Sequence, residues 1–115
     1  MTATFKTGFI GLGAMGYPMA MNLHKAGLLT AAYNRTFAKA EALAKETACF
    51  AARDISALAK HCDAVVMCVS ADQDVLEVVD ALAGSLKNGS LVIDCSTVSA
   101  ETARSAAERL AKHAV

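Results

Sequence analysis

The chain has 115 residues, the length of one domain of ordinary size. Lysine and arginine (11) balance aspartate and glutamate (11), so the formal net charge of 0 gives no general attraction to nucleic acid or to an anionic membrane. Hydrophobic residues make up 55% of the chain and proline occurs once, a composition typical of a folded domain rather than a disordered one.

No N-terminal segment has the roughly 7–15-residue apolar run of a secretory signal, and no run reaches the about 18 apolar residues of a membrane span. The four cysteines form no C-x-x-C pair and no cysteine–histidine spacing suited to zinc. We therefore expect a soluble cytoplasmic protein with reduced thiols, no metal site, and no nucleic-acid or membrane partner.

Short apolar runs alternate with amphipathic segments along the chain, the pattern of a parallel sheet covered by helices. Strands are predicted over residues 7–12, 29–33, 48–51, 64–69 and 90–94. Helices are predicted over residues 14–26, 36–46, 54–61, 72–84 and 99–112, with Thr36, Asp54 and Asp72 as caps and Gly27 as a stop. This order predicts an α/β fold of Rossmann type, a doubly wound parallel sheet in the order 3-2-1-4-5 with helices on both faces.

Three glycines lie at the first predicted junction of strand and helix. Gly11, Gly13 and Gly16 in "GLGAMG" match the pattern G-x-G-x-x-G. Gly11 permits a tight turn, Gly13 leaves room for a pyrophosphate, and Gly16 lets the helix pack on the strand. The free N–H groups from Gly13 through Met15 then face the phosphates. The alternative is a tight structural turn, but the strand–helix context favours a dinucleotide.

The second predicted strand ends in "AAYNRT". A protein that selects NAD places Asp or Glu here, about 20 residues after the glycines, to bind the ribose hydroxyls. Asn34 replaces that carboxylate, Arg35 can bind a 2′-phosphate through two hydrogen bonds, and Thr36 can add a hydroxyl. The pattern predicts NADP rather than NAD, unless Arg35 is a solvated surface residue.

A polar segment, "DCSTVSAETAR", follows the fifth predicted strand. Ser96 and Thr97 therefore lie at the carboxyl edge of the sheet, where ligands bind in such folds. Their hydroxyls can bind a substrate carboxylate or the nicotinamide end of the cofactor. Alternatively, Ser96, Thr97 and Ser99 simply cap the next helix, and the local sequence leaves both readings open.

With these motifs side by side, the chain resembles the β-hydroxyacid dehydrogenase family, which includes 3-hydroxyisobutyrate dehydrogenases, tartronate semialdehyde reductases and glyoxylate or succinic semialdehyde reductases. The segments that carry the resemblance are "GFIGLGAMGYPMAMNL", "YNRT" and "DCST". The resemblance implies an N-terminal dinucleotide-binding domain followed by an all-helical domain that also forms the dimer. We therefore interpret residues 1–115 as the dinucleotide-binding domain of a homo-oligomeric parent, a fragment without the helical domain.

The resemblance also implies roles for individual residues. Ser96 and Thr97 would bind the substrate carboxylate, and Thr97 would lie between cofactor and substrate. The implied cofactor-binding residues are Gly11, Leu12, Gly13, Ala14, Met15, Gly16, Asn34, Arg35, Thr36, Val69, Ser70 and Thr97. The family often has Leu-Pro where this chain has Val69-Ser70, so the contacts of that loop are the least defined. The family's general acid/base is a lysine beyond the fifth strand that matches no position here, so we assign no catalytic residue.

The predicted function of the parent is NADP-dependent transfer of a hydride between nicotinamide and a small β-hydroxy acid or its semialdehyde or keto partner. The fragment alone is expected to be inactive. One alternative is a stand-alone dinucleotide-binding module without catalysis. Another is an enzyme like the imine reductases, although the segment Asp94–Thr97 favours a carboxylate-bearing substrate.

Overall fold

The computed structural model describes residues 5–115 and contains a five-stranded, wholly parallel sheet in the order β3-β2-β1-β4-β5, as predicted. The strands are β1 (Thr7–Ile10), β2 (Leu29–Tyr33), β3 (Phe50–Ala51), β4 (Ala64–Met67) and β5 (Leu91–Asp94). The helices are α1 (Gly16–Lys25), α2 (Phe37–Thr47), α3 (Ile55–Ala59), α4 (Asp72–Ala83) and α5 (Ala100–Ala111). Within the described residues, no helix has both the length and the apolar character that crossing a membrane requires.

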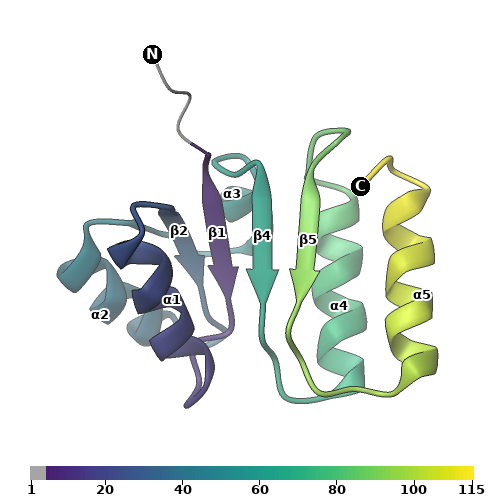
Figure 1. Cartoon of the computed structure of the whole chain (residues 1–115), viewed down its shortest axis with the longest axis horizontal. Coiled ribbons are helices and arrows are strands. Elements are labelled where there is room, and N and C mark those ends of the chain that lie inside the picture. The colour runs from purple at the N-terminus through teal and green to yellow at the C-terminus, as the bar shows by residue number, and fades with distance from the viewer. Residues whose placement is uncertain (1–4) are drawn as a thin grey trace.

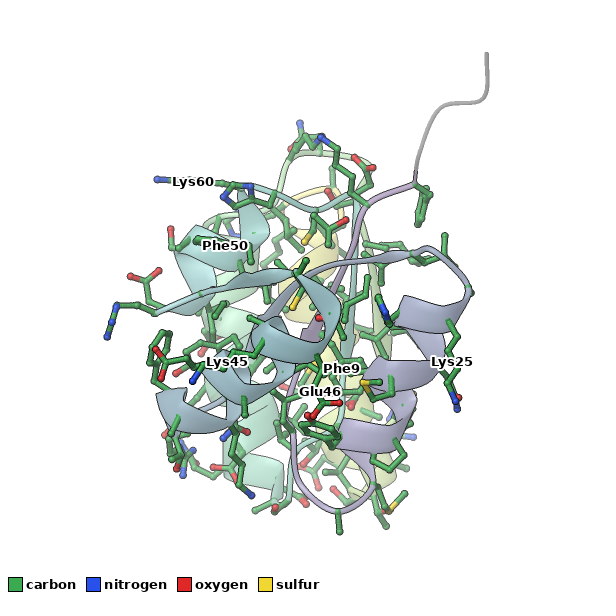
Figure 2. The ribbon with its side chains drawn as sticks, turned by 90° about the vertical axis from the view of Figure 1, so that its left-hand side faces the viewer. Phe9, Lys25, Lys45, Glu46, Phe50 and Lys60 are labelled. Atoms are coloured by element: carbon green, nitrogen blue, oxygen red, sulfur yellow. The ribbon has the colours of Figure 1, made fainter. Side chains whose placement is uncertain are left out.

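Helices cover both faces of the sheet (Figure 1). On one face, α1 and α2 pack over Phe9 and Val66. On the other, α3, α4 and α5 pack over Val65 and Met67. Phe9 is fully buried, and burying a side chain of this size stabilises a fold by roughly 1.5–3 kcal/mol. Figure 2 shows Phe9 in the interior and Lys25 and Lys60 extending outward; Lys45 is exposed as well.

The two central strands differ from the β5 edge. Every residue of β1 and β4 is buried, as expected for parallel strands covered on both faces. In β5, Leu91 and Ile93 are 52% and 44% exposed, while Val92 packs on the face covered by α4 and α5. The face of β5 on the α1 side therefore presents apolar side chains to solvent.

Two predicted strands end earlier than expected. β1 stops at Ile10 rather than Leu12, because Gly11 adopts a φ of +100° and turns the chain out of the strand. β4 stops at Met67 rather than Val69. The predicted helix stop at Gly27 is confirmed, since its φ of +76° is the left-handed conformation that closes α1.

The three predicted caps have different outcomes. Asp54 caps α3, and its carboxylate accepts a hydrogen bond from the N–H of Ala57 at 2.7 Å. Thr36 occupies the N-cap position of α2, but its side chain makes no capping hydrogen bond. The prediction for Asp72 was wrong: Ala71 is the N-cap of α4, and Asp72 is the first helical residue, its carboxylate being used by α5 instead.

The four cysteines are free thiols. Cys49 and Cys62 are buried, and Cys68 and Cys95 are half-buried. Burial raises the pKa of Cys62 to about 12, with a smaller contribution from the neighbouring Asp63 carboxylate. Cys62 is therefore a core residue with an unreactive thiol.

Candidate functional site

The largest concentration of predicted site residues lies in a cavity of about 350 Å³ at the carboxyl edge of the sheet, the lower edge in Figure 1. This volume is in the range of small-molecule sites, and the location is the switch point between β1 and β4, where the chain reverses its direction across the sheet. The predicted residues that line the cavity are Gly11, Gly13, Asn34, Arg35, Val69 and Ser70.

The glycine turn, residues 11–16, forms one wall of this cavity. A Cβ on Gly11 would overlap the carbonyl oxygen of Cys68, and a Cβ on Gly16 would overlap the carbonyl oxygen of Gly11. Beside Gly13, in contrast, a Cβ would meet nothing within 4 Å. Gly11 and Gly16 are thus required by packing within the protein, whereas the space beside Gly13 is open to a ligand.

Asn34 connects the glycine turn to the end of β2. Its Oδ1 accepts a hydrogen bond from the N–H of Leu12 at 2.9 Å, and its Nδ2 donates to the carbonyl of Thr36 at 3.1 Å. The N–H of Gly11 donates to the carbonyl of Tyr33 at 3.0 Å. An amide makes both contacts of Asn34 at once, because it has an acceptor and a donor, and a carboxylate could not donate the second.

Arg35 lies at the mouth of the cavity, and its side chain is 76% exposed. Its Nη2 donates to Oδ1 of Asp74 at 2.7 Å, and Oε2 of Glu77 lies 3.9 Å from the same nitrogen. The hydrogen bond to Asp74 raises the pKa of Arg35 further above its usual value. The guanidinium is therefore charged and held at the surface by helix α4.

Ser96 lies in the β5–α5 loop, outside this cavity but hydrogen-bonded to Val69 in its lining. Its Oγ accepts a hydrogen bond from the N–H of Val69 at 2.9 Å, and its N–H donates to Oδ1 of Asp94 at 2.9 Å. Of the two readings left open by the sequence, the capping role applies to Ser99, whose hydroxyl accepts from the N–H of Thr102. Ser96 instead fixes the β4–α4 loop against the β5–α5 loop.

A second connection between these loops is the Asp72 cluster, formed by Asp72, Ser99 and Thr102. Oδ2 of Asp72 accepts hydrogen bonds from Oγ1 of Thr102 at 2.7 Å and from Oγ of Ser99 at 2.9 Å. These hydrogen bonds lower the pKa of Asp72 below its usual value. The first turns of α4 and α5 are thereby joined beside the predicted substrate loop.

Other predicted residues lie outside the cavity lining. The side chain of Leu12 is buried in the core, and its backbone N–H donates to Asn34. Met15 is 63% exposed at the tip of the turn, next to Ala14. Thr36 contributes its carbonyl to Asn34, and Thr97 is an exposed residue of the β5–α5 loop.

The cavity also contains charged residues that sequence reasoning missed. Lys39, Asp74 and Glu77 line it together with Tyr33 and the apolar residues Ile10, Ile55, Cys68 and Val78. A pattern for part of this set was available, because Asp74, Glu77 and Val78 share one helical face and α4 begins at the carboxyl edge of the sheet, where ligands bind in folds of this type.

These features fit the adenosine and phosphate end of a dinucleotide. The space beside Gly13 gives a phosphate access to backbone N–H groups, and Arg35 and Lys39 provide cations at the mouth. No group of three or more His, Cys, Asp or Glu side chains within residues 5–115 is arranged to hold a metal ion.

Comparisons with known proteins agree with this geometry. Residues 6–115 match the family described as the NAD binding domain of 6-phosphogluconate dehydrogenase. An NAD-dependent L-serine dehydrogenase of Pseudomonas aeruginosa is 36% identical over 99 residues, which cover 84% of this chain and 33% of that protein. The chain spans about a third of the length of the curated relatives it matches.

Two solved structures show the same fold. The 3-hydroxyisobutyrate dehydrogenase of Mycobacterium tuberculosis with L-serine has a TM-score of 0.88 and 25% identity, over 97% of this chain and 38% of that one. The imine reductase of Myxococcus stipitatus in complex with NADP⁺ has a TM-score of 0.85 and 26% identity, over 96% of this chain and 38% of that one. The chain therefore belongs to the β-hydroxyacid dehydrogenase family and corresponds to the NAD(P)-binding domain of that family.

Proposed function

We propose that this domain binds NADP(H) in preference to NAD(H), for an enzyme that oxidises a small β-hydroxy acid or reduces its semialdehyde or keto partner. The observation that carries the cofactor preference is the end of β2, where Asn34 stands in place of a carboxylate and Arg35 lies at the mouth of the cavity. Lys39 adds a second cation to the same cavity. A 2′-phosphate would meet positive charge there, and the amide of Asn34 would not repel it.

The residues of the chain have separate tasks in this proposal. The turn at Gly13 would bind the pyrophosphate through backbone N–H groups, and Arg35 would bind the 2′-phosphate. When bound, the nicotinamide supplies or accepts the hydride. The hydroxyl of Ser96 already accepts from Val69, which leaves its own hydrogen to donate to a substrate carboxylate.

Calorimetric titration of the chain with NADPH and with NADH tests the cofactor preference. We expect NADPH to bind about tenfold more tightly, and Arg35→Ala to remove most of that ratio. Arg109→Ala is the matched control, because Arg109 pairs with Asp80 on a different surface. Equal affinities for the two cofactors in the wild-type chain would refute the proposed preference; the NAD-dependent relative from Pseudomonas aeruginosa makes this outcome a real alternative.

The substrate class is tested on the whole protein. We expect turnover of β-hydroxy acids such as L-serine or 3-hydroxyisobutyrate, and an increase in KM of about tenfold in Ser96→Ala. The likeness to an imine reductase supports a second candidate, reduction of a C=N bond. Turnover of a cyclic imine without turnover of any hydroxy acid would favour that candidate. Cofactor binding with neither activity would favour a non-catalytic binding module.

A further inference from the structure

We infer that Asp74 is a specificity-determining residue of the cofactor site, which weakens the preference for a 2′-phosphorylated dinucleotide by competing for Arg35. This inference rests on the proposed function in that it concerns the same cavity and the same arginine. It adds a residue from α4 that neither the glycine turn nor the end of β2 would identify.

The first observation is the position of the carboxylate. Asp74 lies in the first turn of α4 and is 22% exposed, whereas its partner Arg35 is 76% exposed. Their atoms Oδ1 and Nη2 are 2.7 Å apart. The arginine is thus the more exposed partner of the pair, and the aspartate lies closer to the protein, at a helix N-terminus that favours a negative charge.

The second observation is the charge balance of the cavity. Two cations, Arg35 and Lys39, and two carboxylates, Asp74 and Glu77, line it, so their formal charges sum to zero. Oε2 of Glu77 lies 3.9 Å from Nη2 of Arg35, which adds a second, weaker competitor. The cations that attract a phosphate are therefore partly neutralised by α4 before any ligand arrives.

The consequence differs between the two cofactors. A 2′-phosphate carries more than one negative charge at neutral pH, and to bind Arg35 it must approach within a few ångströms of Asp74. It therefore has to displace the carboxylate from the guanidinium or bind beside it against repulsion. NADH presents a neutral hydroxyl at the same position and meets no such repulsion. Neutralising Asp74 should accordingly strengthen NADPH binding and leave NADH binding nearly unchanged.

The test is calorimetry of the full chain with four probes: NADPH, NADH, 2′,5′-ADP and 5′-AMP. The last two carry the same phosphate difference without the nicotinamide. We expect Asp74→Asn to raise the NADPH-to-NADH affinity ratio about fivefold and Glu77→Gln to raise it about twofold. The matched control is Asp80→Asn, which removes the same charge from the same helix at a residue paired with Arg109 and should leave the ratio unchanged.

Two further measurements separate competition from a structural effect. The increase in the NADPH-to-NADH affinity ratio caused by Asp74→Asn should be smaller when Arg35 is replaced by alanine, because no guanidinium is then present for residue 74 and the phosphate to compete for. It should also shrink at high salt, since the exposed charges are screened. Thermal unfolding of each variant establishes that it is folded, and Glu77→Gln provides an independent test because Glu77 is exposed on the helix surface.

The outcomes distinguish this inference from the proposed function. An unchanged or lowered affinity ratio in Asp74→Asn would overturn the inference, and a lowered ratio would show that Asp74 orients Arg35 for the phosphate. If the wild-type chain shows no NADPH preference but Asp74→Asn acquires one, the proposed preference fails and the inference stands. If Arg35→Ala removes a wild-type preference that Asp74→Asn does not alter, the proposed function stands and the inference fails.

Discussion

Two walls of the same cavity are built in different ways. The glycine turn is shaped by the absence of side chains: Gly11 and Gly16 leave no space for a Cβ, and Gly13 leaves its space open. The other wall is shaped by charged side chains, among them Arg35, which is hydrogen-bonded to Asp74. The first wall is fixed by steric exclusion, and the second by an exposed ion pair.

The difference predicts how each wall responds to substitution. Steric overlap with backbone atoms cannot be relieved by a side-chain movement, so changes in the turn should affect stability strongly. Exposed ion pairs contribute little to stability, so changes at Arg35 and Asp74 should act on recognition instead. Mutations should therefore separate the effect of the turn on stability from the effect of the charged residues on cofactor recognition.

The largest effect is expected at Gly16. In Gly16→Ala the new Cβ would overlap the carbonyl oxygen of Gly11, so α1 must move away from β1, at a cost of about 2–4 kcal/mol in the free energy of unfolding. Urea unfolding followed by circular dichroism measures this change. Gly84→Ala is a suitable control, because the nearest atom to its new Cβ is 4.0 Å away and its φ is −83°. A loss below about 0.5 kcal/mol in Gly16→Ala would contradict the steric account.

Gly13→Ala should separate binding from stability within the same turn. A Cβ at this position meets no protein atom within 4 Å, so the free energy of unfolding should change by less than about 0.5 kcal/mol. The same Cβ occupies the space proposed for the pyrophosphate, and the affinities for NADPH and NADH should both fall about tenfold or more, with their ratio unchanged. Calorimetry with both cofactors measures this. Undiminished affinity would place the pyrophosphate elsewhere.

The Asp72 cluster should give the protein an acid-sensitive contact beside the β5–α5 loop. Hydrogen bonds from Thr102 and Ser99 lower the pKa of Asp72 in the folded state. The ionised carboxylate therefore contributes to the free energy of unfolding at neutral pH. This contribution is lost as the pH falls from about 4 through the lowered pKa of the folded state. We therefore expect Asp72→Asn to be less stable than the wild type at pH 7 and to approach it at pH 3. Urea unfolding at both values measures the difference, and a difference that does not depend on pH would rule out this contribution.

The smallest effect is expected at an ion pair outside the cavity. Nη1 of Arg109 and Oδ2 of Asp80 are 2.8 Å apart, and the two side chains are 37% and 60% exposed. Arg109→Ala should lower the free energy of unfolding by less than about 0.5 kcal/mol in urea titrations, because solvent screens an exposed pair. A much larger loss would mean that exposed pairs stabilise this fold, and Asp74 would then have to be reconsidered as a structural residue.

Much of the fold could be predicted from local patterns. The apolar runs predicted the five strands and their order, and Asp54 and Gly27 predicted the boundaries of two helices. The wrong helix cap shows how a tertiary partner can override a local preference. Asp72 has the residue type of a cap, but the hydroxyls of α5 bind its carboxylate, and Ala71 takes the cap position.

The candidate site shows the same division. The "GLGAMG" and "YNRT" segments follow adjacent strands, so their meeting at one edge of the sheet could be predicted. Asp74 and Glu77 could not be assigned to Arg35, because 39 residues separate Arg35 from Asp74 and no local pattern pairs them. The contact of these two carboxylates with Arg35 depends on how close α4 lies to the end of β2 once the helix has packed on the sheet.

The sequence by itself determined the sheet order, the requirement for glycine in the turn, and the arginine at the end of β2, because periodicity, backbone sterics and side-chain chemistry are local properties. Only the tertiary structure decided that Asn34 binds the glycine turn and that two carboxylates of α4 share the cavity with Arg35. Hydrogen bonds and ion pairs between distant segments depend on distances of a few ångströms, and those distances exist only after the helices have packed.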